Sequence, residues 1–298
     1  MSTMNSEEKA ALLHKRIRNG LKEVFESGSF SDYLKIMSRF HTYSVRNTLL
    51  ILMANPNATL VAGYKAWSRN FNRYVKKGER GIPIFAYTPS KQTVEKELTD
   101  SSGKITVKKE EVIVPAYKVV YVFDISQTSG APLPEPVKEL RGKVDNYTSL
   151  LNSLRIVSPF PIEIRLIDGA KGFCDPDKKQ IIVNTGMSEQ QTVKTIIHEM
   201  VHAIKHVQPS YIPSGNNDRS VEEIEAECVA FVVCEHYGID TSEYSFPYIA
   251  AWSRGKELDD LLEICHSIQQ LAEEIIDKID NPRILKSNSI RSSQCSAS

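Results

Sequence analysis

The segment TIIHEMVHAIKH, residues 195–206, places two histidines four positions apart in an otherwise mostly apolar helical pattern. Residues i and i+4 share one face of a helix, so His198 and His202 can both reach a single Zn²⁺. Glu199 lies next to that face and can take a proton from water on the metal. The apolar remainder predicts a buried helix with only its metal face open to a cleft.

A second helical pattern, SVEEIEAECVAF at 220–231, offers a third ligand. Catalytic zinc usually has three protein ligands and one open position. Carboxylates in so apolar a helix are costly to bury without a partner. Glu223 and Glu227 share a face and Glu225 points roughly the other way, so we predict Glu223 as ligand and Glu227 as a support that orients a ligand histidine. Glu225 or Glu227 as the ligand is the alternative.

Nearby residues allow more than one interpretation. The two histidines and the acidic helix could be purely structural. We expect His206 to be a helix-end residue near the cleft, and His236 to lie at the surface or cap a helix, although it could polarise a carbonyl. The strand KKQIIVNTGM, residues 178–187, could be an edge strand that pairs with an extended peptide, or a plain core strand.

The whole chain has the composition of a soluble globular protein. It has 298 residues, enough for one large domain or two ordinary ones, with 41% hydrophobic and 25% charged residues. No segment has the length and apolarity of a membrane span, and the first 20 residues lack an apolar signal core, so we expect a cytoplasmic protein. Its five cysteines form no C-x-x-C pair and are expected to be reduced thiols.

Charge divides the chain. Residues 1–130 contain 20 Lys/Arg and 12 Asp/Glu, whereas the rest contains 17 and 25, although the net charge is zero. We therefore predict two domains, at 1–130 and 141–285. The alternating prolines of SGAPLPEPVKEL predict a linker at 131–140, and the polar residues 286–298 predict a disordered tail.

Periodicity and turn residues predict an α+β protein. The first half shows helices followed by a mostly antiparallel sheet with a polar excursion near 90–112, either a loop or an exposed hairpin. The second half shows strands on either side of a turn at DPDKK, followed by long helices. Helices are predicted at 6–27, 32–54, 136–156, 188–207, 219–237 and 255–279.

In the basic half, aromatic residues are interleaved with cations. Single strands of nucleic acid are held by aromatic stacking in a basic groove, so this pattern favours single-stranded DNA as partner. The alternative is a core of aromatics with a solvated basic rim. Tyr64, Phe71 and Tyr74 belong to the same pattern, and Gly78 and Gly81 could let the backbone approach a phosphate. The candidate DNA-binding residues are Tyr43, Arg46, Asn47, Lys65, Trp67, Arg69, Arg73, Lys76, Lys77 and Arg80.

These segments resemble the ArdC-like antirestriction proteins and their LtrC-like relatives on plasmids and other mobile elements. In the first half the resemblance rests on YSVRNTLLILMANP, GYKAWSRNFNRYVKKGERGIPIF and VFDISQT. In the second half it rests on HEMVH and EEIEAECVAF, which are also similar to the ImmA/IrrE-type peptidases. The chain departs from ArdC in lacking Trp-Thr-Gly after His202 and in its insertion near 90–112, both of which place it nearer the LtrC-like branch.

The resemblance implies an N-terminal single-stranded-DNA-binding domain and a C-terminal zincin-like metallopeptidase domain of the gluzincin type. One Zn²⁺, with water activated by Glu199, would then cleave a protein or peptide substrate, and an antirestriction role would follow from the family. The alternative is a non-catalytic protein that binds and protects single-stranded DNA, with a structural zinc site. A nuclease fits less well, because phosphodiester cleavage usually recruits carboxylate-rich sites.

Overall fold

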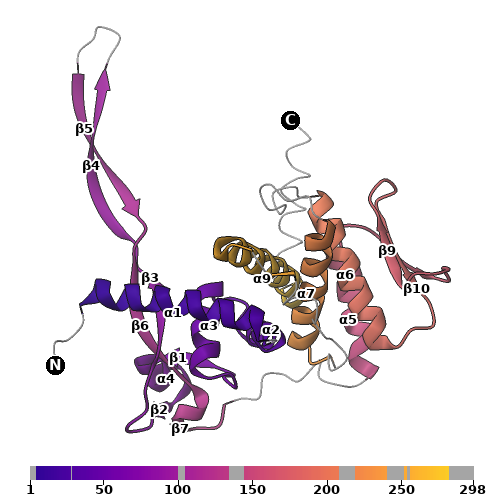
Figure 1. The fold of residues 1–298 in the computed structure, drawn as a ribbon, viewed down its shortest axis with the longest axis horizontal. Coiled ribbons are helices and arrows are strands. Elements are labelled where there is room, and N and C mark those ends of the chain that lie inside the picture. Colours follow the sequence, from indigo (N-terminus) through magenta and orange to yellow (C-terminus); the bar gives the residue numbers. More distant parts are fainter. Residues whose placement is uncertain are drawn as a thin grey trace. The chain divides into compact units, whose positions relative to one another are not determined.

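The computed structural model describes residues 5–27, 29–99, 105–133, 144–207, 219–239, 252–253 and 256–281 (Figure 1). The chain forms two compact units. The first contains Met1–Arg18 and Leu60–Ala131, and the second contains Asn19–Thr59 and Pro132–Ser298. Helix α1 (Ser6–Glu26) contributes residues to both units. None of the helices described is long and apolar enough to cross a membrane.

The first unit is built on a three-stranded antiparallel sheet with the strand order β1-β6-β3. A second pair of short strands, β2 and β7, and a long hairpin, β4 and β5, complete its strands. In chain order the elements after α1 are β1 (Val61–Gly63), α4 (Tyr64–Phe71), β2 (Arg73–Val75), β3 (Ile82–Tyr87), β4 (Ser90–Thr99), β5 (Ile105–Val114), β6 (Tyr117–Asp124), the 3₁₀ turn η1 (Ile125–Gln127) and β7 (Thr128–Gly130).

One face of this sheet forms the core of the unit. Ile82, Ile84 and Val122 lie on that face and are buried, as expected from the two-residue period of a strand. Trp67 of α4 is fully buried, and its Nε1–H donates to the backbone oxygen of Phe123 at 2.9 Å. The indole therefore joins α4 to β6.

The polar excursion near 90–112 is a hairpin. Strands β4 and β5 pair in register from Ser90 opposite Val114 to Thr99 opposite Ile105. Figure 1 shows the hairpin projecting from the end of β3 and β6. Of the two predicted alternatives, loop or exposed hairpin, the structure has the hairpin.

In its described residues, the second unit combines the helices α2, α3, α5, α6, α7 and α9 with a small sheet of the order β8-β10-β9. Helix α7 packs against α2, α6 and α9. The elements are α2 (Phe30–Arg39), α3 (Val45–Ala54), α5 (Val144–Val157), β8 (Ile162–Arg165), β9 (Gly172–Asp175), β10 (Gln180–Asn184), α6 (Glu189–Val207), α7 (Arg219–His236) and α9 (Leu258–Asp280).

The predicted single helix at 32–54 is wrong, because the chain forms α2 and α3 instead. The break follows from a local cap. Ser44 has an extended backbone, and its side chain accepts a hydrogen bond from the N–H of Asn47, which starts α3. The other predicted helices correspond to α1, α5, α6, α7 and α9 within a few residues, except that 136–143 lie outside the described residues.

Mixed helix and strand content confirms the predicted α+β class. The compact units differ from the predicted domains in one respect, because Asn19–Thr59 belongs to the second unit rather than the first. The reason is packing, since α2 buries Tyr33, Leu34 and Met37 and lies against α7. Most of the predicted linker and the whole predicted tail lie outside the described residues, so the boundaries at 131–140, 141–285 and 286–298 stay predictions.

Candidate metal centre

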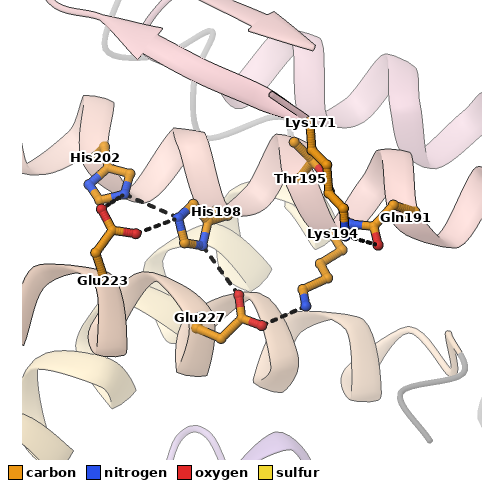
Figure 2. A network of polar contacts seen from close by, with 8 residues as sticks. All are labelled: Lys171, Gln191, Lys194, Thr195, His198, His202, Glu223 and Glu227. Carbon is orange, nitrogen blue, oxygen red and sulfur yellow. Dashed lines mark hydrogen bonds and ion pairs between the residues drawn. The ribbon is translucent and has the colours of Figure 1, made fainter. Parts of the chain in front are cut away.

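Helices α6 and α7 lie side by side and bring two histidines and one glutamate together (Figure 2). The Nε2 atoms of His198 and His202 are 3.2 Å apart. The Glu223 carboxylate places Oε2 3.3 Å from Nε2 of His198 and Oε1 3.5 Å from Nε2 of His202. These are the three residues whose donor atoms all lie within 4.8 Å of one another.

The donor spacing fits a small divalent cation. A tetrahedral ion with ligands at about 2.0–2.1 Å separates those ligand atoms by about 3.3 Å. The distance between the two imidazole nitrogens is 3.2 Å, and those from these nitrogens to the carboxylate oxygens are 3.3 and 3.5 Å. Both histidines are part-buried and Glu223 is exposed, so the donor set opens outward rather than into the core. The arrangement can therefore bind a metal ion and keep one side accessible.

Glu227 lies on the Nδ1 side of His198 and connects it to Lys194 (Figure 2). Its Oε2 is 3.4 Å from Nδ1 of His198, and its Oε1 accepts from Nζ of Lys194 at 2.5 Å. With Nδ1 facing a carboxylate, the Nε2 lone pair of His198 points toward His202 and Glu223. The sequence predicted that Glu227 supports a ligand histidine, but it did not predict the contact with Lys194. The two residues are 33 positions apart, and no local pattern links them.

This network shifts the pKa values of both partners. Burial raises the pKa of Glu227, but the hydrogen bonds and charges of His198 and Lys194 outweigh it, and the net pKa lies below the usual 4.5. Burial lowers the pKa of His198, but the neighbouring carboxylates of Glu227, Glu199 and Glu223 reverse this, and the net pKa lies above 6.5. In the absence of a metal, the carboxylates thus favour the protonated form of His198.

Glu199 is buried next to the donor set and lines the same cleft. Burial raises the pKa of its carboxyl group above the usual 4.5, and the charge of Glu223 adds to the rise, whereas His198 and a hydrogen bond from the backbone N–H of Cys174 lower it. A carboxylate with a raised pKa is a stronger base than an exposed one. A carboxylate at this place can exchange a proton with a water molecule in the cleft, and this role of Glu199 stays a prediction.

The cleft has a volume of about 600 Å³ and is bounded on one side by β9. Gly172 lets this strand approach α6, because a Cβ at that position would lie 2.6 Å from Cγ2 of Thr195. Such a contact would force Thr195 to shift, so only glycine, which has no Cβ, fits at this position. The cleft is lined by Gly172, Phe173, Cys174, Pro176, His198, Glu199, His202, Lys205, His206, Glu222 and Glu223.

Of the two alternatives for residues 178–187, edge strand or core strand, the structure has the core strand. The segment KKQIIVNTGM contains β10, which pairs with β8 in parallel and with β9 in antiparallel orientation, so it is the central strand. Strand β9 is an edge of this sheet, and it borders the cleft. Strand order depends on pairing between distant segments, so it cannot be predicted from the alternation of apolar residues within one strand.

The remaining acidic and histidine candidates occupy different surroundings. Glu225, one alternative ligand, is fully buried and pairs with Lys205 of α6 rather than facing His198. His206 is exposed and lines the cleft. His236 lies within 3.0 Å of the backbone oxygen of Ser38 and 3.6 Å of Asp280, and it is absent from the described lining of the cleft.

Two of the predicted DNA-binding residues have structural roles instead. Trp67 is fully buried, so the prediction that it stacks on a base is wrong. Arg73 donates from Nε to Oγ1 of Thr128 at 2.8 Å, and from its terminal nitrogens to the backbone oxygens of Ala131 and Thr128. An arginine engaged in three hydrogen bonds holds β2 against β7 and has few donors left for a phosphate.

The other predicted DNA-binding residues divide between the two units. Tyr43, Arg46 and Asn47 belong to the second unit, and of these only Arg46 is exposed. The predicted cations Lys65, Arg69, Lys76, Lys77 and Arg80 belong to the first unit, and each of them is exposed.

Comparison with known proteins relates this architecture to one family. Residues 7–123 match the family model for the N-terminal domain of the anti-restriction factor ArdC. This part of the chain is an ArdC-type N-terminal domain. The structure is similar to the crystal structures of the antirestriction protein ArdC from plasmid R388. In its metal-free form the match has 20% identity over 80% of this chain and 86% of that one, with a TM-score of 0.50.

For the Mn(II)-bound form of ArdC the identity is 17% over 89% of this chain and 98% of that one, with a TM-score of 0.53. At this identity the likeness concerns the fold. The chain is also 27% identical, over 92% of its length, to the uncharacterized protein pXO2-81 of Bacillus anthracis. It spans 51% of that relative's length.

Proposed function

We propose that this ArdC-like chain is a zinc-dependent peptidase whose basic first unit binds single-stranded DNA. One observation carries the peptidase proposal: His198, His202 and Glu223 converge on one point beside the buried carboxylate of Glu199, at an open cleft. Two histidines and one carboxylate are a common protein ligand set for catalytic zinc.

The choice of zinc rests on ligand chemistry. Imidazole nitrogens favour zinc and its first-row neighbours over Mg²⁺ or Ca²⁺, which prefer oxygen ligands. The Mn(II)-bound structure of the ArdC relative supports a divalent ion in this fold. An ion held by His198, His202 and Glu223 would act as a Lewis acid and make water more acidic.

The chain's own residues account for the proton transfers and for substrate binding. Glu199 accepts a proton from water in the cleft and returns it to the leaving amine of a cleaved peptide. The edge strand β9 offers backbone N–H and C=O groups to an extended peptide alongside the cleft. Glu227 keeps the Nδ1 proton of His198 in place, so that Nε2 stays available as a ligand.

A non-catalytic site would have a different geometry. Structural zinc sites are closed by four protein ligands, whereas catalytic sites keep one position open. Three residues meet here and face a cleft of about 600 Å³. This openness favours catalysis over a structural role for the metal.

Glu199→Gln tests the peptidase proposal because glutamine keeps the shape of the side chain and removes its basicity. The full chain, loaded with zinc, would be incubated with denatured casein and with a pooled peptide library, and products would be identified by mass spectrometry. We expect Glu199→Gln to retain one zinc per chain and to lose hydrolysis. Glu189→Gln, at the exposed start of the same helix, should behave like the wild type.

Two results would contradict the proposal. One is hydrolysis that survives Glu199→Gln. The other is a wild-type protein that lacks stoichiometric zinc after purification and does not take it up, while His198→Ala behaves identically.

The proposed DNA binding is supported by the charge of the first unit. Residues 1–18 and 60–131 contain 16 Lys/Arg and 9 Asp/Glu, a net charge of +7, and the second unit carries −7. The match to the N-terminal domain of an anti-restriction factor supports an antirestriction role on a mobile element. Affinity for single-stranded DNA should fall as the salt concentration rises, because Lys and Arg side chains that bind phosphates release counterions from the DNA.

The alternative function, DNA protection without proteolysis, makes a separate prediction. If the metal site has no part in antirestriction, Glu199→Gln will leave protection of incoming DNA unchanged in a transformation assay against a restricting host. If proteolysis contributes, protection will fall together with hydrolysis.

A further inference from the structure

Three tyrosines lie exposed on one face of the β1-β6-β3 sheet. Residues opposite one another in an antiparallel pair share a face, and so do alternate residues of one strand. Tyr117 and Tyr121 of β6 are therefore on the same face, and Tyr87 of β3 is paired with Tyr117. Their exposed fractions are 66%, 50% and 56%, respectively. The rings of Tyr87 and Tyr117 are 5.4 Å apart.

Further aromatic rings continue this face at both strands. Phe123, two residues beyond Tyr121, contacts the ring of Tyr64 edge-on at 6.0 Å, and Tyr64 is 63% exposed. Phe85 of β3 stacks on the exposed His14 of α1 at 4.9 Å. We call the seven side chains the aromatic face: His14, Tyr64, Phe85, Tyr87, Tyr117, Tyr121 and Phe123.

Core packing does not explain the exposed tyrosines. The opposite face of the sheet supplies the buried Ile82, Ile84 and Val122. The tyrosines leave half or more of their surface in contact with solvent, which forfeits most of the free energy that burying a ring would provide. Clustered exposed aromatics on a soluble domain mark a binding surface.

We propose that the aromatic face is the platform on which bases of single-stranded DNA stack. Successive same-face residues of a strand are about 6.7 Å apart, which is the spacing of Tyr121 and Phe123 on β6, and Tyr117 lies two such steps from Tyr121. These rings offer separate places for unstacked bases. Duplex bases are already stacked on one another and cannot use such a platform. This inference rests on the proposed binding of single strands and assigns the surface that performs it.

Charge supports this occupant over an apolar protein partner. The unit that carries the aromatic face has a net charge of +7. Lys65 adjoins Tyr64 in the chain, and Arg80 precedes Gly81, which lies against Tyr121 and Phe123. Both cations are exposed. Stacking rings edged by cations match the bases and phosphates of a single strand.

Gly81 also bears on the shape of the face. A Cβ at this position would lie 2.9 Å from Cβ of Tyr121 and 3.1 Å from the Phe123 ring. Any larger residue would therefore displace these two aromatic side chains. Because Gly81 has no side chain, its backbone can lie close to Tyr121 and Phe123 without displacing them.

The test is equilibrium binding of a fluorescein-labelled oligo(dT) of 15 nucleotides to the full chain, followed by anisotropy at several salt concentrations. Tyr117→Ala and Tyr121→Ala should each weaken binding by roughly 5- to 100-fold. Tyr121→Phe keeps the ring and should bind within about twofold of the wild type, whereas Tyr121→Leu should bind like Tyr121→Ala. The slope of affinity against salt should not change, because no cation is removed.

Val94→Ala is the control. Val94 is 40% exposed in the same unit but lies on β4, in the separate two-stranded sheet with β5. It should bind DNA within about twofold of the wild type. Circular dichroism identical to that of the wild type will show that each variant is folded.

The outcomes separate this inference from the proposed function. If the wild type binds single strands and Tyr117→Ala and Tyr121→Ala bind equally well, the aromatic face is not the platform, although DNA binding stands. Equal loss in Val94→Ala, or normal binding by Tyr121→Leu, would also overturn the stacking proposal. A wild-type protein without salt-dependent affinity for oligo(dT) would refute both.

Discussion

Removing one member of the buried ion pair between Lys205 and Glu225 should destabilise the helical unit strongly. Glu225 has 0% of its surface exposed and Lys205 has 6%, and the pair joins α6 to α7. In Lys205→Met the carboxylate of Glu225 stays buried without a counter-ion. We expect this to lower the free energy of unfolding by about 3–5 kcal/mol.

Replacing both members should cost far less. Oε1 of Glu225 has no hydrogen-bond partner in the described part of the chain, so the native pair is incompletely satisfied. Apolar residues of similar volume avoid the cost of keeping two charges out of water. Lys205→Met/Glu225→Leu is therefore expected to lie within about 1 kcal/mol of the wild type, well above either single variant.

The measurement is urea unfolding of metal-free protein, followed by far-ultraviolet circular dichroism and extrapolated to zero denaturant. Lys22→Met is a matched control, because Lys22 pairs with Glu26 at 3.8 Å on the surface. Such a pair contributes at most about 0.5 kcal/mol. The reasoning is refuted if Lys205→Met costs no more than Lys22→Met, or if the double variant is as unstable as the single one.

Three further predictions concern the metal centre and the first unit. Glu227→Gln should weaken zinc binding by about 10- to 100-fold in a chelator competition assay, because Nδ1 of His198 loses its carboxylate partner. Zinc binds only neutral imidazole, and the pKa of His198 lies above 6.5. As the pH is lowered, zinc affinity should therefore begin to decline before pH 6.5 is reached, and a pH series of the same assay measures this. Trp67→Phe should lower the free energy of unfolding by about 1–3 kcal/mol in thermal denaturation, because the backbone oxygen of Phe123 loses its donor; an unchanged melting temperature would contradict this.

Local periodicity was sufficient to predict the donor set. The i, i+4 spacing of His198 and His202 puts both rings on one side of any helix, and Glu223 and Glu227 obey the same rule on the next helix. The structure brings these four side chains together, and their roles in catalysis stay predictions. The charge division of the chain could likewise be read from composition, and it survives in the two compact units.

Features that depend on contacts between distant segments could not be predicted in this way. Trp67 and Tyr121 both belong to patterns of aromatic and apolar residues, yet one lies in the core and the other is half-exposed. Trp67 is buried because α4 packs on β6, and Tyr121 is exposed because it lies on the face of the sheet opposite the buried Ile82 and Val122. The cation partners Lys194 and Lys205 lie 33 and 20 residues from the glutamates that they contact.

The sequence by itself determined which side chains can act as ligands and base, because helical spacing is a local property of the backbone. Tertiary structure decided which strand borders the cleft and which aromatic rings reach solvent. Strand β10 has the more apolar sequence but lies between β8 and β9, which leaves β9 at the edge beside Glu199. Strand order and burial arise from the packing of the whole unit, where long-range pairing outweighs local preference.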